Sequence, residues 1–385
     1  MISKLYKDKM KNFLYLILFL IISCAGKNVL EDPGTEVDIE KVFKLKKGKI
    51  KQFSIVKKDK QKKEDSDDAP NESANHKEKT LKPSIKSKEE KKVIQKEVEK
   101  KVIKEKPEEK KLSKKEEVVQ KPQEEFIVPW KRDDYPEAFK KYNKRYEKFW
   151  ESQNKKYYSG EKFTFDISWT IFRAGTATIE IVDDLEVAGK DAFMLKAKME
   201  SAEYFENIYK LNNTLTTYIS KENFFPIKYE MRQRESGQNV DDVQLFDEKE
   251  LKTYFYYKRL KEGKVKEKSE EKYIPRFFTD SFSALFFVRG LPLKVGYKFG
   301  FPMVTRTKVW LLKAEVVGTE KIEILGQDVE TFKVKAVTQF PGVLKKRGDI
   351  VFWFSKDSLK RLLKFEAKVK IGSVKGELID YRPGK

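Results

Sequence analysis

Cysteine and histidine, the residues that most often supply nucleophiles, general bases and metal ligands, each occur once in this 385-residue sequence, as Cys24 and His76. Activated nucleophiles need a base beside them on one scaffold, and structural or catalytic metal sites need several donors. His76 falls in a Lys- and Glu-rich stretch that is nearly devoid of apolar residues. We therefore expect no Ser-His or Cys-His catalysis, no metal and no cofactor in the folded part of the chain.

Carboxylates are the remaining groups that could catalyse a hydrolysis. Asp241 and Asp242 are adjacent, so on a strand their side chains face opposite sides of the sheet and cannot easily share a site. Asp133 and Asp134 suit the start of a helix, and the chain contains no GxxxxGK[ST] phosphate loop. We expect a protein that is not an enzyme, with a hydrolase built on two carboxylates as the less favoured alternative.

The residues before Cys24 predict an export signal. Four lysines between positions 4 and 11 precede the apolar run 13–22, which ends at small residues. A cationic start, a short apolar core and small residues at the end are typical of a secretory signal peptide. The run has roughly half of the ~20 apolar residues that a membrane-spanning helix needs, so a retained anchor helix is the weaker interpretation.

The sequence Ile21-Ile22-Ser23-Cys24 resembles the lipobox of bacterial lipoproteins. The resemblance implies that residues 1–23 are removed as a signal peptide and that Cys24 is acylated. Several acyl chains hold a protein firmly to a membrane, where one chain would be marginal. We expect a lipid-anchored protein of the cell envelope, and Ala25 fits sorting to an outer membrane with the protein facing the periplasm.

Charge and composition limit the partners. The formal net charge of +21 would suggest nucleic acid in a cytoplasmic protein, but export removes nucleic acid as a partner. Membrane surfaces and anionic envelope polymers remain, beside the simpler reading of a solvated surface. With Cys24 as its lone cysteine, the chain has no internal disulfide.

The stretch 24–125 predicts a disordered tether. Lysine and glutamate dominate its second half, and Phe53 is the only aromatic residue after position 50. Such a segment cannot bury enough apolar surface to offset its chain entropy. Apolar residues between 93 and 103 recur at near-helical spacing, which could support a transient helix or coiled coil before Pro107.

The remainder, 126–385, predicts one folded domain that begins with an amphipathic helix over 134–156. Aromatic residues at offsets of three and four fall on one side of this helix, and basic residues take the others. We expect this face to pack on the following sheet. The alternative, that the helix lies on a bilayer, is kept open.

After Gly160 the apolar period changes from helical to two, which predicts strands with one wet and one buried face. A single helix, beginning at Thr279 or Asp280 and ending near Gly290, interrupts them. The fold class expected is mainly β, a curved antiparallel sheet or open β-barrel with one or two packing helices. Strands are expected over 163–169, 174–181, 193–199, 213–220, 226–234, 241–247, 251–258, 297–301, 305–317, 320–325, 329–340, 349–355, 362–371 and 374–381.

Three stretches carry a further resemblance. Residues 160–177, the sequence Asp280-Ser-Phe-Ser-Ala-Leu with Arg289, and residues 352–378 resemble the DUF3108 family of exported bacterial proteins. The resemblance covers about 158–381. The family has no assigned activity, so it implies no catalytic residues.

A curved sheet with a helix across it leaves either a filled core or a cavity that fits an acyl chain. The broad plan is similar to that of exported carriers of lipids and lipoproteins, an analogy of fold only. We expect a module that binds or carries a hydrophobic or amphiphilic ligand. A structural lipoprotein that docks another envelope protein is the alternative. The candidate ligand-binding residues, all on expected apolar faces, are Phe163, Phe165, Trp169, Phe286, Trp310 and Leu312.

Overall fold

The computed structural model describes residues 128–154, 156–187, 189–207, 209–339, 350–368 and 372–385, together with 42–43, 45, 49 and 53–57. All of them belong to one compact unit. Cys24, His76 and most of the predicted tether lie outside the described residues.

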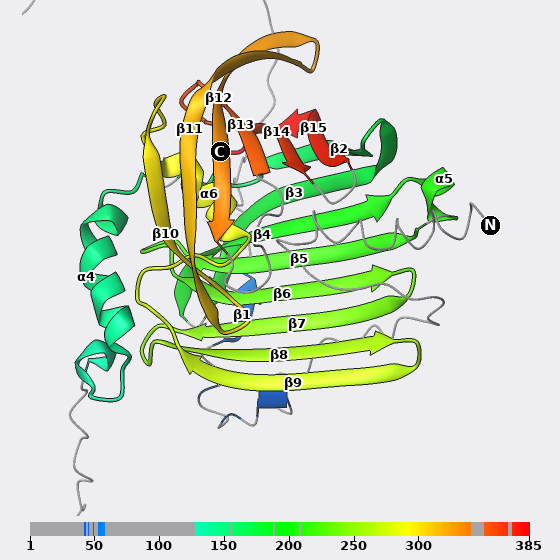
Figure 1. Ribbon diagram of the computed structural model, residues 1–385. Helices are drawn as coiled ribbons and strands as arrows, with labels where there is room; N and C mark the ends of the chain where they lie inside the picture. The colour runs from blue at the N-terminus through cyan, green and yellow to red at the C-terminus, as the bar shows by residue number, and fades with distance from the viewer. Residues whose placement is uncertain are drawn as a thin grey trace, which may run out of the picture. The chain divides into compact units, whose positions relative to one another are not determined.

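One curved antiparallel sheet of 15 strands forms the domain, in the order β10-β11-β12-β13-β14-β15-β2-β3-β4-β5-β6-β7-β8-β9, with β1 paired to β3 (Figure 1). The sheet consists of two antiparallel meanders, which are joined by the pairing of β15 with β2. The first meander comprises β2 (Lys162–Trp169), β3 (Phe172–Val187), β4 (Lys190–Ser201), β5 (Leu211–Ser220), β6 (Pro226–Glu235), β7 (Gln238–Asp247), β8 (Lys252–Lys261) and β9 (Lys264–Tyr273). The second comprises β10 (Lys298–Thr305), β11 (Lys308–Ile324), β12 (Gln327–Gln339), β13 (Ile350–Ser355), β14 (Leu362–Lys368) and β15 (Ser373–Arg382).

The sheet curls but does not close, because β9 and β10 lie at its two ends and are not paired with each other. In Figure 1 the strands β10–β12 run across β4–β9 rather than beside them. The turn between β10 and β11 bridges the gap with side chains: the Arg306 guanidinium contacts the Asp242 carboxylate of β7 at 2.5 Å, and the Thr307 hydroxyl donates to Glu270 of β9 at 2.9 Å.

The chain between β9 and β10 crosses the concave face of the sheet. It contains α6 (Ser283–Phe287) and η2 (Val288–Gly290). Before α6, the Thr279 amide donates to Pro302 and the Val304 amide donates to Thr279, so this segment pairs with the edge strand β10. The helix that was expected to begin at Thr279 or Asp280 is present, but it begins only at Ser283.

The amphipathic helix is α4 (Glu137–Glu151), preceded by η1 (Pro129–Lys131), and it lies within the predicted range 134–156. Its aromatic side packs on the domain: the Trp150 ring stacks on Phe287 at 4.4 Å, and Phe149 lies 6.4 Å from Phe301 of β10. Burial raises the pKa of Tyr135, at the start of this segment, to about 12, and its hydroxyl donates to the Ile274 carbonyl. The aromatic side of α4 thus packs on the rest of the domain.

Two strand predictions need correction. The strand β9 was not expected, because its sequence is almost entirely Lys, Glu and Ser and both of its faces are largely exposed, which leaves no apolar alternation to detect. The predicted strands 305–317 and 320–325 are one long strand, β11, which begins at Lys308 and has a register shift between Val316 and Gly318. Thr305 instead ends β10. A β-bulge accommodates Val317, which has no partner on β12, without ending the strand.

The predicted boundary of the disordered tether also needs correction. Residues Ile55–Lys57 form β1, which pairs with the end of β3, and Phe53 is buried. Phe53 and its described neighbours Phe43, Leu45 and Ile55 are apolar residues that contact an apolar surface on the sheet, and a local sequence pattern does not show that this surface exists. Disorder in the rest of 24–125 stays a prediction.

We predict that Trp150→Ala lowers the free energy of unfolding by about 3–5 kcal/mol, because it removes a buried aromatic side chain and leaves a cavity between α4 and Phe287. Lys144→Ala, on the exposed side of α4, should change it by less than about 0.5 kcal/mol. Urea denaturation measures both. Equal effects of the two substitutions would contradict the packing of α4 described above.

Candidate functional site

A largely apolar cavity of about 160 Å³ lies between the concave face of the sheet and α6. Strands β2 to β5 form its floor, β13 and β14 one wall, and α6 its roof. Its lining includes Phe165, Ala177, Ala197, Met199, Leu215, Phe282, Leu285, Phe352, Phe365 and Ala367. A second cavity of about 50 Å³, which shares Ser281, Leu285, Ile350 and Phe352 with the first, continues toward Leu312 of β11.

Small inward-facing residues create the space. Phe165, Ala177 and Met199 lie side by side on β2, β3 and β4, and Ala197 and Leu215 are paired on β4 and β5. Because Ala177 and Ala197 have small side chains, they leave space between the sheet and α6 that bulkier side chains would fill. An apolar cavity of this size can hold an apolar group.

The ring of Phe365 is placed against the cavity by a glycine. Phe365 of β14 is paired with Gly376 of β15, and a Cβ at position 376 would lie 2.3 Å from the ring. No side chain larger than hydrogen fits there unless the ring moves. Gly376 therefore keeps the Phe365 ring flat on the sheet, where it lines the cavity.

One end of the cavity has polar groups behind it. Tyr209 lines the cavity, and its hydroxyl donates to Glu235 at 2.7 Å. The Glu235 carboxylate also accepts from the side-chain amides of Asn213, Gln233 and Gln238. Burial raises the pKa of Glu235, although these four hydrogen bonds oppose that effect.

The same end carries exposed apolar residues. Ile171 and Phe172, in the tight turn between β2 and β3 and at the start of β3, are 88% and 54% exposed. Tyr204, in α5 (Glu203–Glu206), is 59% exposed, and its hydroxyl donates to the carbonyl of Arg173 at 2.6 Å. Because Ala174 and Phe205, their close neighbours in sequence, line the cavity, this apolar rim lies beside it.

A buried carboxylate starts the roof helix. The Asp280 carboxylate accepts hydrogen bonds from the amides of Phe282 and Ser283 and from the Thr217 hydroxyl of β5. It thereby caps the first turn and ties it to the floor of the cavity. Burial raises the pKa of Asp280, and the hydrogen bonds act in the opposite direction.

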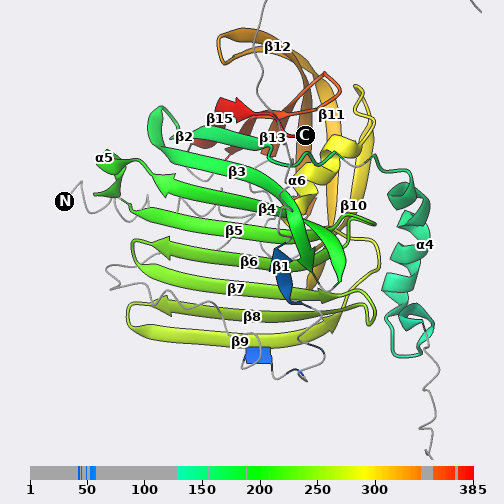
Figure 2. The same ribbon diagram turned by 180° about the vertical axis from the view of Figure 1, so that it is seen from behind.

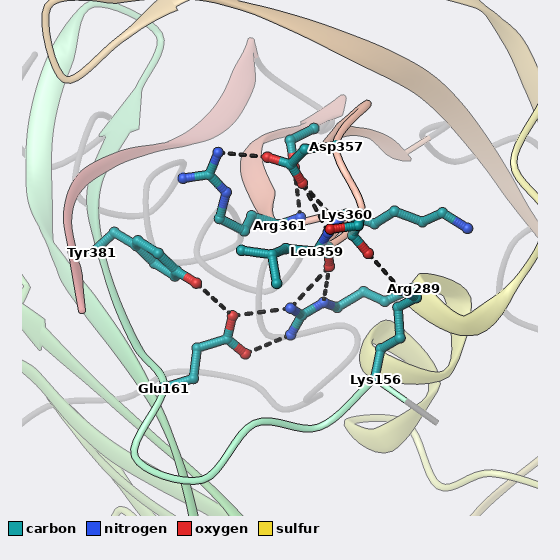
Figure 3. Close-up of polar contacts among 10 residues, drawn as sticks. Lys156, Glu161, Arg289, Asp357, Leu359, Lys360, Arg361 and Tyr381 are labelled. Atoms are coloured by element: carbon teal, nitrogen blue, oxygen red, sulfur yellow. Dashed lines mark hydrogen bonds and ion pairs between the residues drawn. The ribbon is translucent and has the colours of Figure 1, made fainter. Parts of the chain in front are cut away.

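A buried ion pair fixes the other end of the roof (Figure 3). Arg289 of η2 makes two parallel hydrogen bonds to Glu161, at 2.7 and 2.9 Å, with both side chains at most 1% exposed. The same guanidinium donates to the Leu359 carbonyl before β14, and the Tyr381 hydroxyl of β15 donates to Glu161. The pair therefore joins the roof to the segments just before β2 and β14 and to β15 itself. Burial raises the pKa of the Tyr381 hydroxyl.

Comparison with known proteins identifies the family. The family model of the protein of unknown function DUF3108 matches residues 164–379, which is more than half of the chain. The chain belongs to the DUF3108 family.

The matched range contains the cavity floor, α6 and Arg289, whereas Glu161 lies just before it. No curated protein matches this DUF3108 chain. Two crystal structures resemble it at low identity. A β-barrel-like protein of the domain of unknown function DUF1849 from Brucella abortus has a TM-score of 0.41 and 10% identity over 58% of this chain and 98% of its own. A proposed lipoprotein from Parabacteroides distasonis has a TM-score of 0.24 and 9% identity over 58% of this chain and 95% of its own.

The structure brings together only some of the predicted ligand-binding residues. Phe165 lines the larger cavity and Leu312 the smaller one. Phe163 and Phe286 are buried in the adjoining core, with ring centroids 6.2 Å apart, and do not line it. Trp169 packs under the apolar rim with Ala174, Phe205 and Tyr209, and Trp310 packs against the main core away from both cavities.

Several lining residues were missed. Phe282, Leu285, Phe352 and Phe365 were expected in strands or the helix but not assigned to the site. The inward alanines at 177 and 197 were the available signal, since small residues at buried positions of neighbouring strands indicate space.

Among the described residues no helix is long and apolar enough to span a membrane. Within the same residues no group of His, Cys, Asp and Glu side chains could hold a metal ion.

We predict that Arg289→Met lowers the free energy of unfolding by about 3–5 kcal/mol, because Glu161 is left buried without its cation. The double substitution Arg289→Met, Glu161→Met should lose much less, since it removes both charges. Denaturation of both variants and of Glu161→Met alone completes the cycle. A double variant that is as unstable as Arg289→Met would show that packing, and not the unpaired charge, sets the loss.

Proposed function

We propose that this DUF3108 protein is a lipid-anchored protein of the cell envelope that binds an apolar chain of an amphiphilic ligand beneath α6. The cavity is the observation that carries the proposal. Its lining is overwhelmingly apolar, and its volume of about 160 Å³ suits part of an acyl chain. The ligand would be held by burial of apolar surface, without covalent chemistry.

The rim supports an amphiphile rather than a wholly apolar ligand. Glu200, Ser201 and the Tyr209–Glu235 pair lie at the end of the cavity where polar atoms gather. A polar head group could remain there while the chain enters between the sheet and α6. Ile171, Phe172 and Tyr204 offer an exposed apolar surface beside this end, where a ligand could leave a bilayer without crossing water.

We predict that Ala177→Phe abolishes ligand binding, because the new side chain fills the cavity from its floor. Thr178→Phe is the matched control: it adds the same ring at the next position of β3, on the opposite face of the sheet. Native mass spectrometry of the full-length protein purified from its host should show a bound amphiphile in the unchanged protein and in Thr178→Phe, but not in Ala177→Phe. Absence of any bound amphiphile from all three would refute the proposed function.

The proposed location rests on Cys24, which lies outside the described residues. We propose attachment to the outer membrane, with the domain facing the periplasm. Cys24→Ser should move the protein from the membrane pellet to the soluble fraction, because it removes the site of acylation. If the substituted protein stayed in the pellet after washing with high salt, the lipid anchor would be wrong.

A further inference from the structure

A segment from the N-terminal part of the chain packs on the convex face of the sheet. Strand β1 runs antiparallel to the end of β3, with Ile55 opposite Val187 and Lys57 opposite Leu185. Phe53, just before it, is 3% exposed. It belongs to an apolar cluster with Leu185, Val187, Ala192, Tyr218, Ile227, Val243, Leu245 and Tyr254.

This cluster lies on the side of the sheet opposite the cavity. On β5, Leu215 lines the cavity and Tyr218 belongs to the cluster, and side chains an odd number of residues apart on a strand face opposite sides. Figures 1 and 2 agree, since β1 lies behind the sheet when β10–β12 lie in front of it. The convex surface is therefore independent of the proposed ligand site.

Residues upstream of β1 contact the same surface. The Phe43 ring meets Tyr254 and Tyr256 of β8 edge-on, with centroids 6.4 Å apart in each case. The Lys49 ammonium lies 3.2 Å from the Asp247 carboxylate and 5.2 Å from the centre of the Tyr254 ring. Phe43, Lys49 and Ile55–Lys57 thus contact the convex face through aromatic rings, an ion pair and a strand pairing, respectively.

We propose that the described residues 42–43, 45, 49 and 53–57 form a docking segment for the convex face, and that the Lys- and Glu-rich tract is consequently not the tether that separates the domain from its N-terminal anchor. The chain leaves the sheet after Lys57 and rejoins the same compact unit at Val128. The intervening 58–127, or 127 − 57 = 70 residues, therefore begins and ends at the domain. The tract therefore does not increase the distance that can separate the domain from the N-terminal end of the chain.

The consequence for the anchor rests on the proposed acylation of Cys24. Only residues 25–41, or 41 − 24 = 17 residues, then separate the lipid from the docking segment. Fully extended they reach roughly 60 Å, and as a flexible coil roughly 20–25 Å. A tether running from Cys24 to Val128 would reach roughly 350 Å when extended. The docking segment keeps the domain close to its membrane.

Cutting the chain within the Lys- and Glu-rich tract distinguishes a docked N-terminal segment from a tether that runs from Cys24 to Val128. A specific protease site inserted between Pro70 and Asn71 cuts the chain into an N-terminal fragment with the docking segment and a C-terminal fragment with the rest of the domain. The soluble Cys24→Ser protein with a C-terminal tag is cut and captured by the tag at high salt. We expect the N-terminal fragment to be captured in near-equal amount with its partner. Its loss on washing would overturn the proposal.

A matched pair of substitutions tests the surface. Phe53→Asp places a charge in the apolar cluster and should release the N-terminal fragment after cutting, whereas Val56→Asp, at a 57% exposed position of β1, should retain it. Release by both substitutions, or by neither, would contradict docking through the Phe53 side. Hydrogen exchange on the uncut, unsubstituted protein gives a second measurement: slow exchange is expected at residues 55–57, and exchange there at the rate of an unstructured peptide would refute the pairing.

The anchor is tested separately. In membranes carrying the unsubstituted Cys24 protein, the cut C-terminal fragment should stay in the pellet, and Phe53→Asp should release it. If capture of the soluble fragments succeeds but the whole protein is found outside the membrane, the anchor fails and the docking segment stands. If the soluble fragments separate, the docking segment fails whatever the location or the ligand.

Discussion

The bidentate contact between Arg289 and Glu161 is the constraint on which the interior of this protein depends. The sheet has two ends that do not pair, and the chain between β9 and β10 crosses its concave face. Two neighbouring charges with almost no solvent access tolerate little displacement, since each would be left without a partner in a medium of low polarity. The Leu359 carbonyl and the Tyr381 hydroxyl complete the hydrogen bonds of the pair.

Polar contacts at both ends of α6 make the apolar cavity below it compatible with a stable fold. Asp280 holds the start of the helix to β5, and Arg289 holds the segment that follows it to the other side of the sheet. A roof fixed at both ends does not collapse onto the inward alanines of β3 and β4. The space is thus bordered by hydrogen bonds at its edges, while its lining is largely apolar.

Local patterns predicted most strands but not the contacts that bring distant segments together. Alternation was sufficient for β2 and β14, because one face of each is wet and the other buried. It failed for β9, where neither face is apolar, and for β1, whose apolar partners belong to other strands. Phe165 and Leu312 were correctly placed on apolar faces, yet the position of the cavity depends on which strands are neighbours. The partner of Arg289 lies 128 residues away, a pairing that a single sequence does not encode in any local pattern.

The open end of the sheet at β9 has a consequence for the association of one copy of the chain with another. A bare strand edge is a template for adding another strand. The strand β9 repeats lysine and glutamate along both faces, and Lys264, Lys266, Lys268 and Lys272 lie among its ten residues. Pairing of two such edges would bury almost no apolar surface, so β9 is a poor template for the addition of a strand from another copy.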